Sequence, residues 1–185
     1  MGPIPLDLGL CVIRRWREGD AISLARHANS RPVWHNLRDD FPHPYTEKHA
    51  VRFLAGAVRV DPPRQFAIVV AGEPVGGIGY RLDTAARRCA AELGYWVNES
   101  YWGRGIGTAA VHAMTAFAFR AHTLLDRIYA VSFASNGASA RVLEKAGFTL
   151  ESTIRLGAVK EGRAVDQVLY AIVREEGKNR HATDR

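Results

Sequence analysis

The feature that most constrains this chain is a run of alternating glycines, Gly103-Arg104-Gly105-Ile106-Gly107, between a predicted strand and a predicted helix. The strand ends near Val97, and an apolar-periodic run begins at Ile106. Glycines in such a turn allow a positive φ and a close approach of the main chain to a ligand. The first amides of the helix lack partners within it and, with the positive end of its dipole, attract anions. We therefore predict a diphosphate-binding loop.

Two other phosphate-binding patterns fit this stretch poorly. A P-loop needs four residues between its glycines and then Lys followed by Ser or Thr, and this pattern is absent. The dinucleotide fingerprint G-x-G-x-x-A fits residues 105–110, and Asp126 follows at a spacing of roughly 20 residues. However, Asp126 precedes a predicted strand instead of closing one, and about half of the chain precedes the glycines. A nicotinamide-binding domain is therefore disfavoured.

The glycine run resembles a known cofactor loop. Trp102-Gly103-Arg104-Gly105-Ile106-Gly107-Thr108 is similar to the acetyl-coenzyme A loop of the GCN5-related N-acetyltransferase (GNAT) superfamily. That superfamily usually carries Gln or Arg at the position of Trp102, whereas tryptophan is usual in its ribosomal-protein N-terminal alanine acetyltransferase (RimJ/RimL-like) branch. The departure at Trp102 therefore narrows the resemblance to this branch.

Two further segments carry the same resemblance. Residues 136–148 are similar to the family pattern N-x-x-S-x-x-V-L-E-K-x-G-F, with Asn136, Ser139 and Gly147-Phe148 at the family spacing. The run from Glu92 to Val97 precedes the glycine loop. Together the three segments follow one another in the family order, and the resemblance extends over nearly the whole chain.

The resemblance implies an α/β (α+β) fold, in which a mixed, mostly antiparallel central sheet of about seven strands is flanked by helices. It also implies direct transfer of an acetyl group from acetyl-CoA to a primary amine. The residues expected to bind the cofactor are Trp96, Val97, Trp102, Gly103, Arg104, Gly105, Ile106, Gly107, Thr108, Asn136 and Ser139. Main-chain amides near Trp96 and Val97 are expected to hold the acetyl group.

An amine attacks a thioester only when it is neutral, so a base must remove its proton. The resemblance places an acidic residue near Glu92, which is therefore the candidate base, acting through water. The alternative interpretation is a surface carboxylate or an ion-pair partner of Arg87 or Arg88.

The departing thiolate gains from a hydrogen bond or a proton. Many superfamily members use a tyrosine for this purpose, but the corresponding residue here is Leu143. Ser139 becomes the candidate for this role, and Asn136 the candidate for binding the cofactor or the amine. The alternative is that both residues cap a helix N-terminus, and the two roles are compatible.

The aromatic segment 31–45 is expected to line the acceptor site. Asp39 or Asp40 would attract an ammonium group, while Trp34, Phe41 and Tyr45 would form walls. The alternative is that these aromatic residues only anchor a loop.

Periodicity and turn residues predict the secondary structure. Expected strands cover residues 10–16, 65–70, 74–82, 89–97, 127–133, 149–156 and 165–174. Expected helices cover residues 20–29, 46–60, 106–122 and 138–146. Residues 31–45 are expected to form a loop with short turns. The strands 65–70, 74–82 and 89–97 are expected to form an antiparallel meander that leads into the glycine run.

Length and composition limit the remaining alternatives. The chain of 185 residues is expected to form one domain over 1–174, with a polar tail over 175–185. The net charge is +6, but the basic residues are dispersed, so nucleic acid is disfavoured as the main partner. The two cysteines form no CxxC pair, which favours a reducing, cytoplasmic setting. Neither a membrane span nor a metal site is expected, because apolar runs are short and the histidines lack ligand spacing.

Three classes of function stay open at this point. The first is an amine N-acetyltransferase, acting on a protein N-terminal α-amine or on a small molecule such as a polyamine, amino acid or aminoglycoside. The second is a non-catalytic acyl-CoA sensor. The third is a ribosome- or RNA-associated protein, whose binding would weaken steeply with salt. Ribosome association and a homodimer are compatible with the first class.

Overall fold

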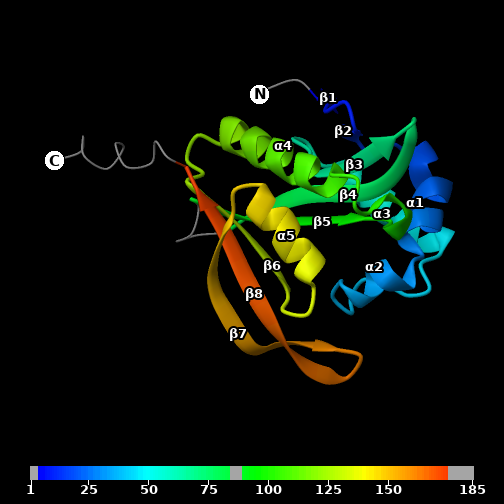
Figure 1. Cartoon of the computed structure of the whole chain (residues 1–185). Helices are drawn as coiled ribbons and strands as arrows, with labels where there is room; N and C mark the ends of the chain where they lie inside the picture. The colour runs from blue at the N-terminus through cyan, green and yellow to red at the C-terminus, as the bar shows by residue number, and fades with distance from the viewer. Residues whose placement is uncertain (1–3, 84–88, 175–185) are drawn as a thin grey trace.

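The computed structural model describes residues 4–83 and 89–174, and one eight-stranded sheet runs through them (Figure 1). The strand order is β1-β2-β3-β4-β5-β6-β8-β7, with β5 and β6 as the parallel pair. The strands are β1 (Leu6–Asp7), β2 (Val12–Arg15), β3 (Gln65–Val70), β4 (Glu73–Leu82), β5 (Ala90–Val97), β6 (Arg127–Phe133), β7 (Thr149–Lys160) and β8 (Arg163–Val173). The expected mixed, mostly antiparallel sheet is confirmed, and β1 is too short for periodicity to indicate it. The predicted tail over 175–185 lies outside the described residues.

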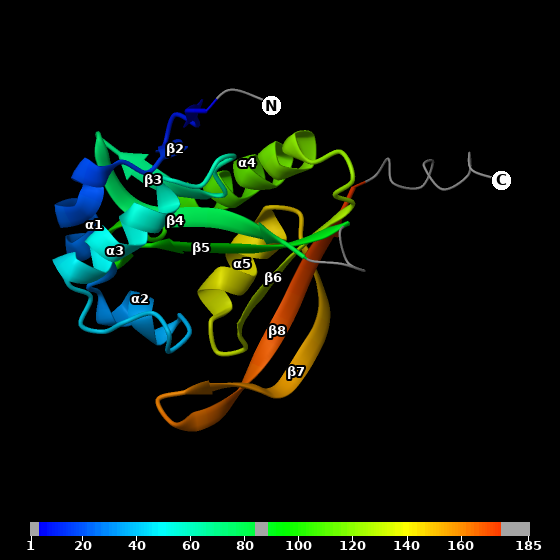
Figure 2. The same ribbon diagram turned by 180° about the vertical axis from the view of Figure 1, so that it is seen from behind.

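Helices cover both faces of the sheet (Figures 1 and 2). On one face lie α4 (Ile106–Ala121) and α5 (Gly137–Lys145), and on the other α1 (Ala21–Ala28) and α3 (Glu47–Ala57). Each face has its own apolar cluster, because both sides of the central strands carry apolar residues. The α4 side includes Ile78, Met114 and Phe117, and the α1 side includes Trp16, Leu24 and Leu54. No helix within residues 4–83 and 89–174 has the length and apolar content to cross a membrane.

The segment expected to be a loop contains a short helix, α2 (Arg31–His35). Ser30 precedes it and its hydroxyl accepts a hydrogen bond from the Val33 amide at 3.2 Å. Pro32 lies in its first turn, where a missing amide proton costs nothing. A serine followed closely by proline is a helix-start signal, so the helix was indicated locally although the aromatic and proline-rich composition favoured a loop. This prediction was wrong for residues 31–35.

The strands β5 and β6 are paired over only part of their length. Residues 90–92 pair with residues 127–129 in parallel register. Beyond this point, no pairing joins Leu93–Val97 to Ala130–Phe133 in the part of the chain that the structure describes. Both strands remain bonded to their other neighbours, β4 and β8. The central sheet therefore contains a gap between two well-supported edges.

The hairpin β7–β8 extends beyond the rest of the sheet (Figure 1). Its strands reach Lys160 and start again at Arg163, so both are longer at this end than predicted. The two residues between them, Glu161 and Gly162, have φ values of +50° and +75°. Tight two-residue hairpin turns need positive φ at both positions, and the long hairpin follows from this turn.

Candidate active site

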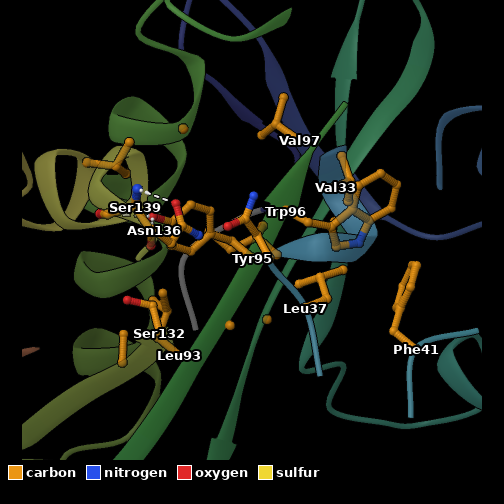
Figure 3. A pocket seen from close by; sticks show the side chains of 18 of the residues that line it. Val33, Leu37, Phe41, Leu93, Tyr95, Trp96, Val97, Ser132, Asn136 and Ser139 are labelled. Carbon is orange, nitrogen blue, oxygen red and sulfur yellow. Dashed lines mark hydrogen bonds between the residues drawn. The ribbon is translucent and has the colours of Figure 1, made fainter. Parts of the chain in front are cut away.

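A cavity of about 1080 Å³ lies at the gap between β5 and β6, slightly above the range of about 300–1,000 Å³ that is common for ligand pockets. Its lining comes from both faces of the sheet, because the gap opens to both. Figure 3 shows Tyr95, Asn136 and Ser139 on the α5 side, and Leu37 and Phe41 on the opposite side. Two ligands could thus meet through the sheet.

The glycine loop lies at the rim of this cavity. Gly103 and Gly105 have φ values of +74° and +78°, a region that glycine enters without strain. Gly105 is the N-cap residue of α4, and no side chain among the described residues caps this end. The first amide bonded within the helix is that of Ala109, which donates to Gly105 O at 3.0 Å. The preceding amides are available to an anion, and Gly103, Arg104 and Gly105 are exposed.

Trp102 anchors the glycine loop to the end of β5. Its Nε1–H donates to the carbonyl oxygen of Val97 at 2.6 Å. The Arg104 guanidinium lies over the Tyr101 ring, 5.3 Å from the centroid. Trp102 therefore contributes to the loop through its indole N–H and holds the backbone in place at the mouth of the gap.

Register decides which amides of β5 face the gap. Asn98 N–H donates to Val75 O at 2.9 Å, and hydrogen-bonded pairs alternate along an antiparallel ladder. The Trp96 amide therefore points toward β4, while the amides of Tyr95 and Val97 point into the gap. Of the amides near Trp96 and Val97, those of Tyr95 and Val97 are therefore placed to bind a ligand in the gap.

Tyr95, Ser139 and Asn136 form a hydrogen-bonded group on the α5 side. Tyr95 Oη lies 2.9 Å from Ser139 Oγ. The Asn136 side-chain oxygen accepts from the Ser139 amide at 3.1 Å, so Asn136 is the cap of α5 while it also lines the cavity. Leu143 is fully buried. The group therefore offers two hydroxyls to a ligand in the gap.

Burial raises the pKa of Tyr95 to about 12, against the opposing effect of its hydrogen bond with Ser139. Its hydroxyl is therefore protonated at neutral pH and can donate. Tyr95 was not among the site residues predicted from the sequence. The signal was the alternation along β5, which places Tyr95 on the same face as Leu93 and Val97, toward α4 and α5.

Glu92 lies on the other face of β5 and is held between two arginines. Its Oε1 accepts from Arg38 Nη2 at 2.5 Å, and its Oε2 accepts from Arg81 Nη2. The carboxylate is only 15% exposed and lines the cavity. The alternative partners considered above, Arg87 and Arg88, lie outside the described residues.

The acceptor side differs from expectation at two residues. Trp34 and Asp39 are not among the residues that line the cavity, and both contact Lys160. The Lys160 ammonium lies 2.8 Å from Asp39 Oδ1 and 3.6 Å from the centroid of the Trp34 ring. It also donates to the carbonyl oxygens of Trp34 and Leu37, each at 3.0 Å. The cation that Trp34 and Asp39 contact in the structure is therefore a lysine of the chain.

Phe41 and Tyr45 do line the cavity, as expected. Their rings are stacked with centroids 4.9 Å apart, and the centroids of the Phe41 and Trp96 rings are 6.2 Å apart. Burial raises the pKa of Tyr45 to about 12. These aromatic rings form an apolar wall of the cavity. No group of three or more His, Cys, Asp or Glu suited to a metal ion occurs within residues 4–83 and 89–174.

Comparisons with known proteins agree with this geometry. The N-acetyltransferase YoaA of Bacillus subtilis, itself uncharacterized, is 33% identical over 102 residues, which are 55% of this chain and 56% of YoaA. The chain spans about half the length of the curated relatives it matches. Mycobacterium smegmatis RimJ, solved with a CoA-disulfide, is 28% identical with a TM-score of 0.78, covering 95% of this chain and 87% of that one.

The ribosomal-protein-S5-alanine acetyltransferase of Vibrio fischeri has a TM-score of 0.81 at 22% identity, covering 94% and 98% of the two chains, which shows a shared fold. The model of the acetyltransferase (GNAT) domain matches residues 11–149. The resemblance drawn from the glycine run and from residues 136–148 is thereby confirmed: the chain belongs to the GNAT acetyltransferase family.

Proposed function

We propose that the chain is an acetyl-CoA-dependent N-acetyltransferase that transfers the acetyl group directly to a primary amine, with a protein N-terminal α-amine as the favoured acceptor. One observation carries the proposal: the open N-terminus of α4 leads into a gap in the sheet, and Glu92 lies on the far side of that gap. Family membership and the CoA-bound RimJ neighbour support it. The ribosomal-protein acetyltransferase of similar fold is the reason for favouring an N-terminal amine.

The residues present fit a CoA thioester. The amides of residues 104–108 would hold its diphosphate, as helix N-termini led by glycines do. The free edges of β5 and β6 offer hydrogen-bonding groups to an extended arm, and an unpaired main-chain amide in such a place gains from any polar ligand. The Tyr95 and Val97 amides would then bind the acetyl carbonyl oxygen and stabilise the charge that develops there.

The chain's own groups account for the proton transfers. Acetyl transfer forms a bond between the amine nitrogen and the thioester carbonyl carbon, and the C–S bond breaks with its electrons leaving on sulfur. Glu92 would accept the amine proton through water, and a positioned base contributes about 10²–10⁴-fold. Ser139 would protonate the thiolate, Tyr95 is placed to return a proton to Ser139, and water would in turn reprotonate Tyr95.

An acceptor screen tests this function. Purified protein is mixed with acetyl-CoA and a panel of N-terminal peptides, polyamines, amino acids and aminoglycosides, and thiol release is followed. Transfer to at least one amine is expected. Tight acetyl-CoA binding by calorimetry without turnover across the panel would favour the sensor, and RNA binding that weakens steeply with salt would favour the third class.

A Glu92→Gln variant tests the base. The rate is expected to fall mainly at lower pH, where little of the amine is neutral without help. Glu47→Gln, an exposed change at the start of α3, is the matched control. A pH–rate profile that is the same in wild type and Glu92→Gln would remove Glu92 from this role.

A further inference from the structure

Three arginines bring positive charge to the acceptor side of the cavity. Arg38 comes from the segment after α2, Arg52 from α3 and Arg81 from β4, and all three line the cavity. The acidic residues that line it are Asp40 and Glu92, among the residues described. This end of the cavity therefore carries a positive excess, which would oppose a polycationic ligand.

Glu92 does not use up the two arginines that bind it. Arg38 and Arg81 each give it one nitrogen, Nη2, while a guanidinium carries five N–H donors. The side chains of Arg38 and Arg81 are 60% and 68% exposed, so both guanidinium groups are open to the cavity mouth. A second carboxylate could therefore be bound next to Glu92.

This geometry selects among acceptor amines. An amine that reaches Glu92 comes close to the two guanidiniums that bind it, which attract an accompanying carboxylate and repel further ammonium groups. One extended residue spans about 3.3 Å, so an acidic side chain at the second or third position of a peptide reaches the guanidiniums while the α-amine reaches Glu92. The cavity, with a volume of about 1080 Å³, leaves room for such a chain.

We propose that the acceptor is an anionic amine, an N-terminal peptide segment with acidic residues directly after its α-amine, and that Arg38 and Arg81 determine this specificity. The inference rests on the proposed acetyltransferase function. A carboxylate of the acceptor takes hydrogen bonds from the N–H groups of Arg38 and Arg81 that do not bind Glu92. Polyamines and aminoglycosides are excluded by the same charges.

Matched peptides test the proposal. Ala-Glu-Glu, Ala-Gln-Gln and Ala-Lys-Lys peptides of otherwise identical sequence are compared as acceptors, with kcat/KM from thiol release and Kd from calorimetry. The wild type is expected to prefer the acidic over the basic peptide by about tenfold or more, equivalent to about 1.4 kcal/mol. The preference is expected to shrink with added salt.

Variants assign the preference to the two arginines. The Arg38→Gln/Arg81→Gln double variant is expected to lower the acid-to-base ratio to about threefold or less. The ratio compares two peptides on one enzyme, so a change in the basicity of Glu92 affects both peptides alike. Arg120→Gln, an exposed change near the end of α4, is the control and should keep the wild-type ratio.

Equal kcat/KM and equal Kd for the acidic and basic peptides would overturn the proposal, as would a ratio that survives the double variant. The binding measurement separates this inference from the proposed function. Charge-selective binding without any acetyl transfer would sustain the arginine specificity and refute the acetyltransferase function. Transfer without charge preference would sustain the acetyltransferase function and refute the arginine specificity.

Discussion

Replacing Lys160 with methionine removes the ammonium that ties the β7–β8 hairpin to the segment after α2. Lys160 is only 5% exposed. Methionine keeps most of the apolar stem, so the change isolates the head group, whose contacts are the Trp34 and Leu37 carbonyls, Asp39 and the Trp34 ring.

The magnitude follows from these contacts. A hydrogen bond from a charged donor contributes roughly 1.5–3 kcal/mol, and a cation–π contact about 0.5–2 kcal/mol. The methionine variant no longer has to bury an ammonium group, and the desolvation cost that it avoids offsets several kcal/mol of this sum. Of the two carbonyls, Trp34 O also accepts from the Leu37 amide at 3.0 Å, so chiefly Leu37 O loses its partner. We expect a net loss of about 2–3 kcal/mol in the free energy of unfolding.

Thermal and denaturant unfolding measure this loss. One kcal/mol lowers Tm by about 2–4 °C for a chain of this size, so the loss of about 2–3 kcal/mol in Lys160→Met should lower it by about 4–12 °C. Lys48→Met, on the exposed surface of α3, should stay within about 0.5 kcal/mol of wild type. The acceptor KM should also rise, because the segment after α2 carries Arg38 and Phe41 into the cavity, while the Kd for acetyl-CoA should not change.

A Tm of Lys160→Met within error of Lys48→Met would refute this reasoning, since it would mean that the four head-group contacts contribute nothing net. A lower Tm with an unchanged acceptor KM would keep the structural role of Lys160 and separate it from the acceptor site.

Three further predictions concern single groups. Tyr95→Phe removes the hydroxyl beside Ser139 and should lower kcat by about tenfold or more with an unchanged acetyl-CoA Kd; an unchanged kcat would exclude Tyr95 from proton supply. Gly105→Val forces a β-branched residue to φ near +78°, at a strain of roughly 1–3 kcal/mol, and calorimetry should show weaker acetyl-CoA binding. The hydrogen bond from Lys160 lowers the pKa of Asp39, so its stabilisation is present above the usual aspartate pKa of about 3.9 and is lost as pH falls through the lower folded value. Asp39→Asn should therefore flatten the acid limb of a stability–pH curve, and an identical limb would contradict the pairing.

The parts of the fold that local patterns describe were predicted from the sequence. The meander β3–β4–β5 and the helix α4 are confirmed, because alternation, 3.6-residue periodicity and turn residues are all local signals. The glycine run is also read locally, since positive φ at Gly103 and Gly105 is a property of those positions. The loop geometry needed for an anion site was thus available before any tertiary contact.

Contacts between distant segments could not be predicted in this way. Glu92 and Arg38 are 54 positions apart, and Lys160 reaches carbonyls 126 and 123 positions away. Local rules choose elements but not the side chains that meet when elements pack, so Asp39 was assigned to a substrate ammonium when a lysine already occupied it. Tyr95 was an intermediate case, since its face was predictable and its partner Ser139 was not.

The gap between β5 and β6 has a kinetic consequence. Because it passes from one face of the sheet to the other, the acyl donor and the amine can enter by separate openings, and neither must depart before the other arrives. Initial-rate plots at varied concentrations of both reactants should therefore intersect instead of running parallel. A sheet closed along its full length would have forced the two reactants to share one entrance.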